Sequence, residues 1–365
     1  MTWKYLDETK SANKKYREDM LQRINSWWAH FQNKRKPIEA FLEGRAHFDV
    51  EDFMAECLQV IDENLMWEFG TEPGGKYQLV ITPETERHLR PLVESVVSMA
   101  PKLQNWSFYA YRQPHGVADT AELVRDNSGV ALDDFAFFAE PDDDHLINLQ
   151  FQYKGSKGTE ARTDAVFTAT EYLLGEEVLD KWIGDMDFVE AAHENFLPMS
   201  ELPNTVASII ERTKGKLPGQ PISAERAKLK RQTFTGEPEE DDQADRMDIV
   251  SATTLIPHIW HAAHNGGAFD SSRFSKHNER FCYLKIDDVV EPQKVGELEE
   301  RINDALLATQ AGCTTGNAIA TEGCYIDLCV TDPLKAVSAL KGVISSHCSM
   351  RFFDAELAAE SITLN

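Results

Sequence analysis

The sequence predicts an α+β protein made of tandem ferredoxin-like (βαββαβ-type) modules behind an N-terminal amphipathic helix. Three observations support this fold class. In some segments apolar residues recur at three- and four-residue steps, as on one face of a helix, whereas in others they alternate, as on one face of a strand. The two patterns follow each other in a similar order along the chain. A length of 365 residues with a hydrophobic content of 42% is enough for more than one core.

Residues 1–48 are predicted to form a helical arm. Apolar residues between Tyr16 and Phe31 share one helical face. Pro37 is expected to end this helix or to begin the next one. The segment holds ten Lys and Arg and six Asp and Glu, a charge of +4, so the rest of the chain carries −28 (−24 minus +4). We expect this basic arm to dock on the acidic body, with recruitment of an acidic partner as the alternative.

Residues 49–115 are predicted to form a first α-β-β-α-β module. Its elements are a helix over 50–65 capped by Asp49, strands over 66–70 and 76–82, a helix opened by Thr82-Pro83-Glu84, and a strand over 106–112. Residues 116–197 repeat this order. Their elements are a helix over 120–126, a hairpin of 133–139 with 146–154, a helix over 162–174 ended by Gly175, and a strand over 178–189.

The last third of the chain divides into a connector and a third module. Residues 198–278 are predicted to be a helical and loop connector, with a helix over 202–212 and an acidic linker over 235–245. Residues 279–365 are predicted to form a C-terminal ferredoxin-like module. Its elements are strands over 280–286, 316–320, 324–330 and 350–353, a helix over 292–308, and a helix that begins at Asp332-Pro333. The two earlier modules lack a clear opening strand.

Several short sequence segments of the first module resemble a bacterial family of uncharacterised proteins, a domain of unknown function. The segments that carry the resemblance are Trp67-Glu68-Phe69-Gly70, Leu79-Val80-Ile81-Thr82-Pro83, the stretch from Ala100 to Phe108, Tyr111-Arg112, and the aromatic helix with Trp27, Trp28 and Phe31. Leu174-Gly175-Glu176 and Tyr325-Ile326-Asp327-Leu328 are similar to later segments of that family. The resemblance implies a bacterial, cytoplasmic origin, and it implies no activity and no catalytic residue.

Charge and cysteine content restrict the classes of partner. A net charge of −24 argues against nucleic acid and against an anionic membrane surface, because both recognise Lys and Arg. No apolar run is long enough for a membrane span, and no secretory signal precedes the first helix. The six cysteines form no C-x-x-C pair, so we expect free thiols in a cytoplasmic protein. We expect no cofactor, and the sequence does not indicate an oligomeric state.

One face of the C-terminal sheet is the predicted binding surface. Helices cover one face of a ferredoxin-like sheet. Alternate residues of a strand point to opposite faces, so we expect the more apolar of the two sets in each strand to face the helices. The opposite, open face then receives Phe281, Tyr283, Lys285, Tyr325, Asp327 and Cys329. Because exposed aromatic patches are uncommon on monomers, we expect something to cover this face: a small-molecule ligand, a protein partner, or another module of the chain.

Two other constellations could carry chemistry. His258, His261 and His264 form H-x-x-H-x-x-H, which could bind a metal only if the helix bends or ends, because the outer two point about 120° apart. Cys329 and the pair His347-Cys348 offer a thiol and an imidazole, although no sequence feature brings the two segments together. We therefore interpret the chain as a non-enzymatic intracellular binding or regulatory protein. The alternatives are a metal-dependent hydrolase that uses the three histidines and a small-ligand binder at a module interface.

Overall fold

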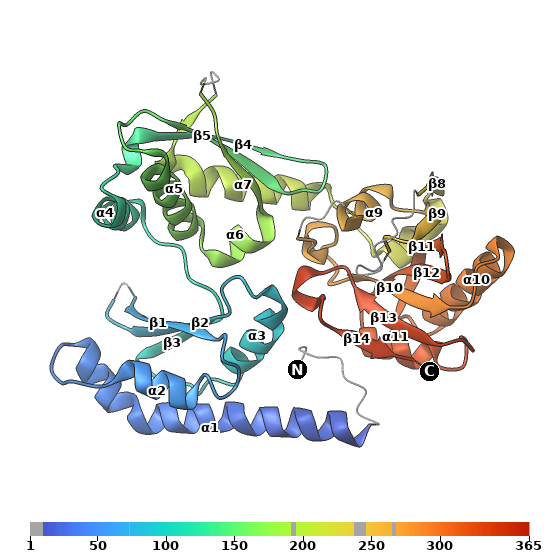
Figure 1. Ribbon diagram of the computed structural model, residues 1–365, viewed down its shortest axis with the longest axis horizontal. Helices are drawn as coiled ribbons and strands as arrows, with labels where there is room; N and C mark the ends of the chain where they lie inside the picture. The colour runs from blue at the N-terminus through green and yellow to red at the C-terminus, as the bar shows by residue number, and fades with distance from the viewer. Residues whose placement is uncertain (1–9, 73, 191–194, 237–245, 265–267, 365) are drawn as a thin grey trace. The chain divides into compact units, whose positions relative to one another are not determined.

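The computed structural model shows an α+β protein whose strands form three separate sheets (Figure 1). It describes residues 10–72, 74–190, 195–236, 246–264 and 268–364. The chain divides into two compact units: unit 1 contains residues 1–129 and 163–179, and unit 2 contains residues 130–162 and 180–365. The finer division into five ranges stays a prediction, and most of the predicted linker over 235–245 lies outside the described residues.

Unit 1 combines helices with one small sheet. Its elements are α1 (Ser11–Leu42), α2 (Val50–Cys57), β1 (Met66–Thr71), β2 (Tyr77–Thr82), η1 (Arg87–Leu89), α3 (Arg90–Ser98), β3 (Trp106–Tyr109), α4 (Val117–Ser128) and most of α5 (Thr159–Leu174). The sheet has the order β1-β2-β3, in which β1 is antiparallel and β3 parallel to β2. Trp27 and Phe31 of α1, both fully buried, pack with Trp106 in the core of this unit.

Three predicted features of unit 1 need correction. The first helix neither ends nor begins at Pro37, because α1 continues through that residue to Leu42. A proline removes a single helical N–H, and the next residue, Ile38, is fully buried in the core that holds the helix in place. The second helix ends at Cys57 and not at residue 65. The third begins at Arg90, because Glu84 has a left-handed φ of 51° that no helical first turn can contain.

The β-β-α-β order of unit 1 does not produce a ferredoxin-like sheet order. In a ferredoxin-like sheet the opening strand lies between the last strand and the second strand of the hairpin. No opening strand precedes β1 among the described residues, so β3 pairs directly with β2. The same arrangement recurs in unit 2, where β6 pairs in parallel with β5 of the hairpin.

Unit 2 begins with a four-stranded sheet of order β6-β5-β4-β7. Its elements are η2 (Leu132–Asp134), β4 (Phe135–Pro141), β5 (Ile147–Tyr153), β6 (Ile183–Phe188), β7 (Leu197–Pro198), η3 (Met199–Glu201) and α7 (Leu202–Lys216). The strand predicted over 178–189 is correct only in its second half, since helix α6 (Glu176–Trp182) comes first. Gly175 ends α5 with a left-handed φ of 77°, as predicted, and two glutamates then open α6.

The second sheet of unit 2 has seven strands in the order β14-β13-β10-β12-β11-β9-β8. The strands are β8 (Gln232–Thr235), β9 (Ile249–Thr254), β10 (Arg280–Asp287), β11 (Gly312–Ala320), β12 (Gly323–Val330), β13 (Cys348–Phe352) and β14 (Ser361–Thr363). The helices around it are α8 (Ile222–Glu225), η4 (Arg226–Lys228), α9 (Pro257–His264), η5 (Ser271–Arg273), α10 (Pro292–Ala308), α11 (Pro333–Leu340) and η6 (Ala355–Leu357). The four middle strands are those predicted for the C-terminal module, whereas β8, β9 and β14 were not predicted.

No helix in the described part of the chain combines the length and the apolar character that crossing a membrane requires.

Candidate functional site

The six residues predicted on the open face of the C-terminal sheet lie together as three cross-strand pairs. In the antiparallel register of β10 and β12, Phe281 is opposite Cys329, Tyr283 opposite Asp327, and Lys285 opposite Tyr325. Opposite residues in an antiparallel pair project from the same face of the sheet. The alternation in the sequence therefore placed all six residues on one surface of the two central strands.

This face is covered by the chain itself. Phe281 is 1% exposed and packs with Ile259 and Ala262 of α9. Tyr325 is 2% exposed and packs with Tyr283 in an adjoining cluster. The prediction that this aromatic surface is not left bare is confirmed, and the covering elements belong to unit 2.

The guanidinium of Arg246 lies within a cage of three aromatic rings on this face. Its Cζ atom is 5.1 Å from the ring centroids of Tyr283 and Tyr325 and 5.2 Å from that of Phe353. Cations within about 6 Å of an aromatic ring are attracted by its negative face. Asp327 closes the base of the cage: its Oδ1 accepts a hydrogen bond from Arg246 Nη1 at 2.6 Å and its Oδ2 accepts one from Nη2 at 3.3 Å.

His264 completes the coordination of this guanidinium as a neutral acceptor. Arg246 Nε donates to His264 Nε2 at 2.9 Å, so the ring proton must be on Nδ1, which is 2.6 Å from the Trp260 carbonyl oxygen. The imidazole also stacks on Trp260, with 4.2 Å between ring centroids. Burial, and then the positive charge of Arg246, lower the pKa of His264 to about 4. The cage thus presents one carboxylate, one imidazole lone pair and three π faces to a planar cation.

The backbone at Arg246 is strained, whereas the cage lies mainly on regular elements. Arg246 has a φ of 73°, which is uncommon for a residue with a side chain, and its N–H donates to Tyr325 Oη at 3.2 Å. Arg246 precedes β9 and belongs to no helix or strand. Tyr283, Tyr325 and Asp327, by contrast, lie on the central strands β10 and β12. Central strands therefore hold most of the cage residues in place, whereas Arg246 enters the cage from a turn.

A hollow of about 860 Å³ opens next to the cage and shares Tyr325 with it. Lys285 lines the same hollow, together with the carboxylates of Asp248 and Asp287. Tyr325 Oη donates to Asp248 Oδ1 at 2.9 Å, so the tyrosine connects the hollow to the caged cation.

The three histidines of α9 face different neighbours. His258 lies against the ring of Phe274, His261 against Phe234, and His264 against Arg246. In the described part of the chain no three His, Cys, Asp or Glu side chains are placed to hold a metal ion. The structure therefore does not bring the predicted ligands together.

The cysteines lie in surroundings that keep them protonated. All six are free, and every one except Cys57 is buried. Burial raises the pKa of Cys329 well above its ordinary value and that of Cys348 to about 12. Because the thiolate is the nucleophile, the predicted thiol and imidazole pairing gains no support from these environments.

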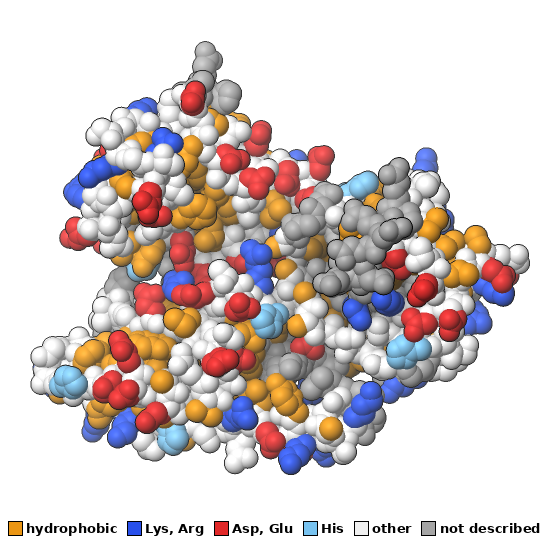
Figure 2. All heavy atoms as spheres, viewed as in Figure 1, with side chains coloured by type: hydrophobic (Ala, Val, Ile, Leu, Met, Phe, Trp, Pro, Cys, Tyr) orange, Lys and Arg blue, Asp and Glu red, His pale blue; other side chains and the backbone are white. Residues whose placement is uncertain are grey.

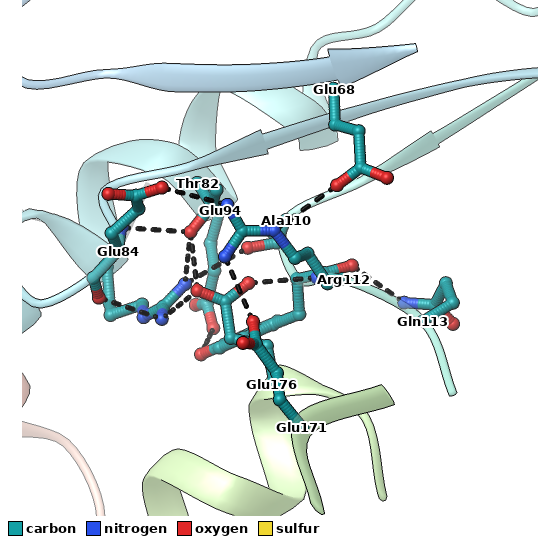
Figure 3. Close-up of polar contacts among 11 residues, drawn as sticks. Glu68, Thr82, Glu84, Glu94, Ala110, Arg112, Gln113, Glu171 and Glu176 are labelled. Carbon is teal, nitrogen blue, oxygen red and sulfur yellow. Dashed lines mark hydrogen bonds and ion pairs between the residues drawn. The ribbon is translucent and has the colours of Figure 1, made fainter. Parts of the chain in front are cut away.

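A second cluster of charged side chains, in unit 1, was not predicted (Figure 3). Arg90, only 2% exposed, contacts Glu176 Oε1 through Nη2 at 2.6 Å, and the same oxygen accepts a hydrogen bond from Thr82 Oγ1 at 2.6 Å. Glu176 Oε2 accepts the backbone N–H of Arg112 at 2.9 Å. The carboxylate of Glu176 is thus held by three donors, and Arg90 also lies 4.5 Å from the Tyr111 ring centroid.

The guanidinium of Arg112 spans three carboxylates in the same cluster (Figure 3). It contacts Glu68 at 3.2 Å, Glu84 at 2.8 Å and Glu171 at 3.0 Å. Burial acts to lower the pKa of Arg112, but Glu84, Glu171 and Glu176 outweigh it and hold that pKa above its ordinary value. Glu68, Thr82, Arg112 and Glu176 come from four separate parts of the sequence that no regular spacing connects, so the sequence pattern offered no signal for this cluster.

Comparison with protein-family models, with curated proteins and with solved structures finds no match for this chain.

Proposed function

We propose that the chain is a non-enzymatic binding protein whose C-terminal sheet face recognises a guanidinium group, with the Arg246 side chain as an internal ligand that competes for the same cage. The observation that supports this most directly is the caged guanidinium, which contacts three rings, a carboxylate and an imidazole acceptor. A planar forked cation matches these groups better than a point charge does. The ligand is then an arginine side chain of a partner, or a small guanidinium compound.

The chemistry of the surrounding residues supports binding over catalysis. The candidate thiols are buried and protonated, and the histidine triplet faces three different environments. The alternative of a metal-dependent hydrolase gains no support, because no group of three metal-binding side chains is found among the described residues. We further propose that the module carrying the cage is ferredoxin-like, since the order β13-β10-β12-β11 and its antiparallel pairings are consistent with that fold. Six free thiols favour a cytoplasmic protein, in keeping with the bacterial resemblance.

If Arg246 occupies the cage as an internal ligand, it must weaken the affinity of the cage for an added guanidinium compound by a predictable factor. When a site is competent for only a fraction of the time, the apparent dissociation constant rises by the inverse of that fraction. If Arg246 vacates the cage about 1% of the time, wild-type protein binds about 100-fold more weakly than a variant without this side chain. The strained φ of Arg246 lowers the cost of moving it.

The test is calorimetric titration of the full chain with N-acetyl-argininamide. Arg246→Ala should bind it at least about tenfold more tightly than wild type, which should still bind measurably. The lysine analogue should bind the variant more weakly, because it lacks the fork that matches Asp327. Arg246→Ala/Asp327→Asn should bind neither compound.

Two results would contradict the proposal. If Arg246→Ala binds the arginine analogue but wild type shows no heat at the solubility limit, Arg246 is a structural ion pair and not a competing ligand. If Arg246→Ala keeps the wild-type circular dichroism spectrum and binds neither analogue, the cage has no recognition role. Should Arg246→Ala not fold, Arg246→Gln, which has a shorter, uncharged polar side chain, replaces it in both comparisons.

A further inference from the structure

An aromatic groove in unit 1 lies where the end of α1, the start of α2 and strand β1 meet. It has a volume of about 500 Å³, and Phe41, Phe48, Trp67 and Phe69 contribute to its lining. The rings of Trp67 and Phe69 alternate with Glu68 on β1, so both lie on one face of the strand, with centroids 5.6 Å apart. Figure 2 shows hydrophobic side chains gathered over this part of unit 1, with acidic side chains beside them.

The groove leaves large apolar side chains in contact with water. Phe41, which lines the groove, is 38% exposed. Phe48, Trp67 and Phe69 are half-buried. Contiguous apolar surface of this kind marks an interaction site more often than single exposed residues do.

Strand β1 supplies the second observation, because it is an unprotected sheet edge. It pairs with β2 alone among the described strands, from Met66 opposite Thr82 to Thr71 opposite Tyr77. Its six residues contain no proline, lysine or bulge, which are the usual protections of an edge. Its one charged residue, Glu68, contacts Arg112 in the charged cluster of unit 1 (Figure 3). The backbone of β1 can therefore accept another strand.

Charge decides what kind of strand fits. Asp49 and Glu51 line the groove at the start of α2, and neither Lys nor Arg is among its lining residues. The whole chain carries −24. Complementary charge steers association and suppresses like-charged partners. A partner segment with lysine or arginine beside its apolar residues matches this surface, whereas an acidic segment does not.

We propose that a partner polypeptide docks here as an extended, basic segment that adds a strand to the edge of β1 and places alternate apolar side chains in the aromatic groove. Main-chain hydrogen bonds then provide affinity and the groove provides side-chain selection. This surface lies in unit 1, and the inference does not depend on the Arg246 cage, which lies in unit 2.

The probe is a fluorescein-labelled, end-blocked peptide of alternating lysine and valine with one central phenylalanine, titrated with the full chain by anisotropy. We expect saturable binding that weakens as salt is added. Phe41→Ala should weaken it about tenfold, because an aromatic anchor is lost. Phe167→Ala is the matched control, since Phe167 is 50% exposed in unit 1 away from the groove. It should leave affinity within about twofold.

Charge and strand pairing are tested separately. Glu51→Lys should weaken binding and flatten its salt dependence, whereas the control Glu63→Lys, also exposed, should do neither. A peptide in which proline replaces both a central lysine and the adjacent valine should not bind, because neighbouring N–H groups point to opposite edges of a strand and one of the two prolines must then remove a hydrogen bond to β1.

Three outcomes would overturn the proposal. The first is an equal loss of affinity in Phe41→Ala and Phe167→Ala, with both variants folded by circular dichroism. The second is a proline peptide that binds as well as the parent. The third is light scattering that shows self-association lost in Phe41→Ala without any peptide binding, because a second copy of the chain is then the occupant.

Discussion

The buried Arg90–Glu176 pair makes the sharpest prediction for stability. Glu176→Gln removes the carboxylate that Arg90 contacts at 2.6 Å, while both side chains lie almost entirely out of water, at 2% and 7% exposure. Breaking a buried ion pair by changing one partner costs about 3–5 kcal/mol, since the remaining charge stays desolvated. Glutamine keeps one oxygen that can accept from Thr82 or Arg112, so we expect the lower end, about 3 kcal/mol.

The assay is urea denaturation of Glu176→Gln and of a closed cycle made of the single variants Arg90→Met and Glu176→Met and the double variant Arg90→Met/Glu176→Met. Apolar replacement of both partners removes the desolvated charges together, so the double variant should lose about 2 kcal/mol less than the two singles added. The Thr82 and Arg112 donors to Glu176 lose their acceptor in the double variant, which keeps it below wild type. Glu291→Gln is the control, because its pair with Lys294 is 64% exposed on both sides. That change should cost under about 0.5 kcal/mol.

The reasoning is refuted if Glu176→Gln unfolds at the same urea concentration as Glu291→Gln, or if the two single variants and the double variant are additive. Either result would mean that the cluster in Figure 3 is solvated enough in solution for its charges not to depend on each other.

Four further predictions concern the sheet face, His264, the cysteines and the histidine triplet. Tyr325→Ala should lower the free energy of unfolding by roughly 2–4 kcal/mol, because Tyr325 is 2% exposed in an intramolecular core, whereas Tyr16→Ala, at 42% exposure, should cost under about 1 kcal/mol in the same urea titration. His264 has a lowered pKa, so the unfolded chain binds its proton first as pH falls. Relative to His264→Gln, the free energy of unfolding of wild type should therefore fall by up to about 3 kcal/mol between pH 7 and pH 4, because the loss occurs between the unfolded pKa of 6.5 and the folded pKa of about 4. If the difference in free energy of unfolding between wild type and His264→Gln does not change over that range, the buried Arg246–His264 contact is contradicted. Native protein should expose Cys57 first to a thiol reagent and all six thiols after denaturation, and elemental analysis after tag-free purification should find no stoichiometric transition metal, whereas about one zinc per chain that is lost in His261→Ala would restore the hydrolase interpretation.

The parts of the fold that follow from neighbouring residues could be predicted from the sequence. The helix over residues 292–308 was predicted with the bounds of α10, and Asp332 caps α11 by accepting the Lys335 N–H, as expected from Asp-Pro at a helix start. Period-two alternation placed the six open-face residues on one surface, because register errors of one residue would bury the wrong set. The helix features depend on contacts within one turn, and the faces of each strand depend on alternation along that strand, so sequence spacing fixes both.

The occupant of the open face and the charged cluster of unit 1 were decided by tertiary structure alone. Arg246 reaches Asp327 across 81 positions, and Arg90 reaches Glu176 across 86, so no local period relates either pair. The same limit applies to β9, which joins the sheet by pairing with β11 far along the chain, and to β3, which pairs directly with β2 because no opening strand lies among the described residues. The sequence by itself determined the elements with a clear period, such as α10 and β12, and which residues of each strand share a face. Which distant residue fills a face depends on long-range packing and on the burial of charge, and these exist only once the chain has folded.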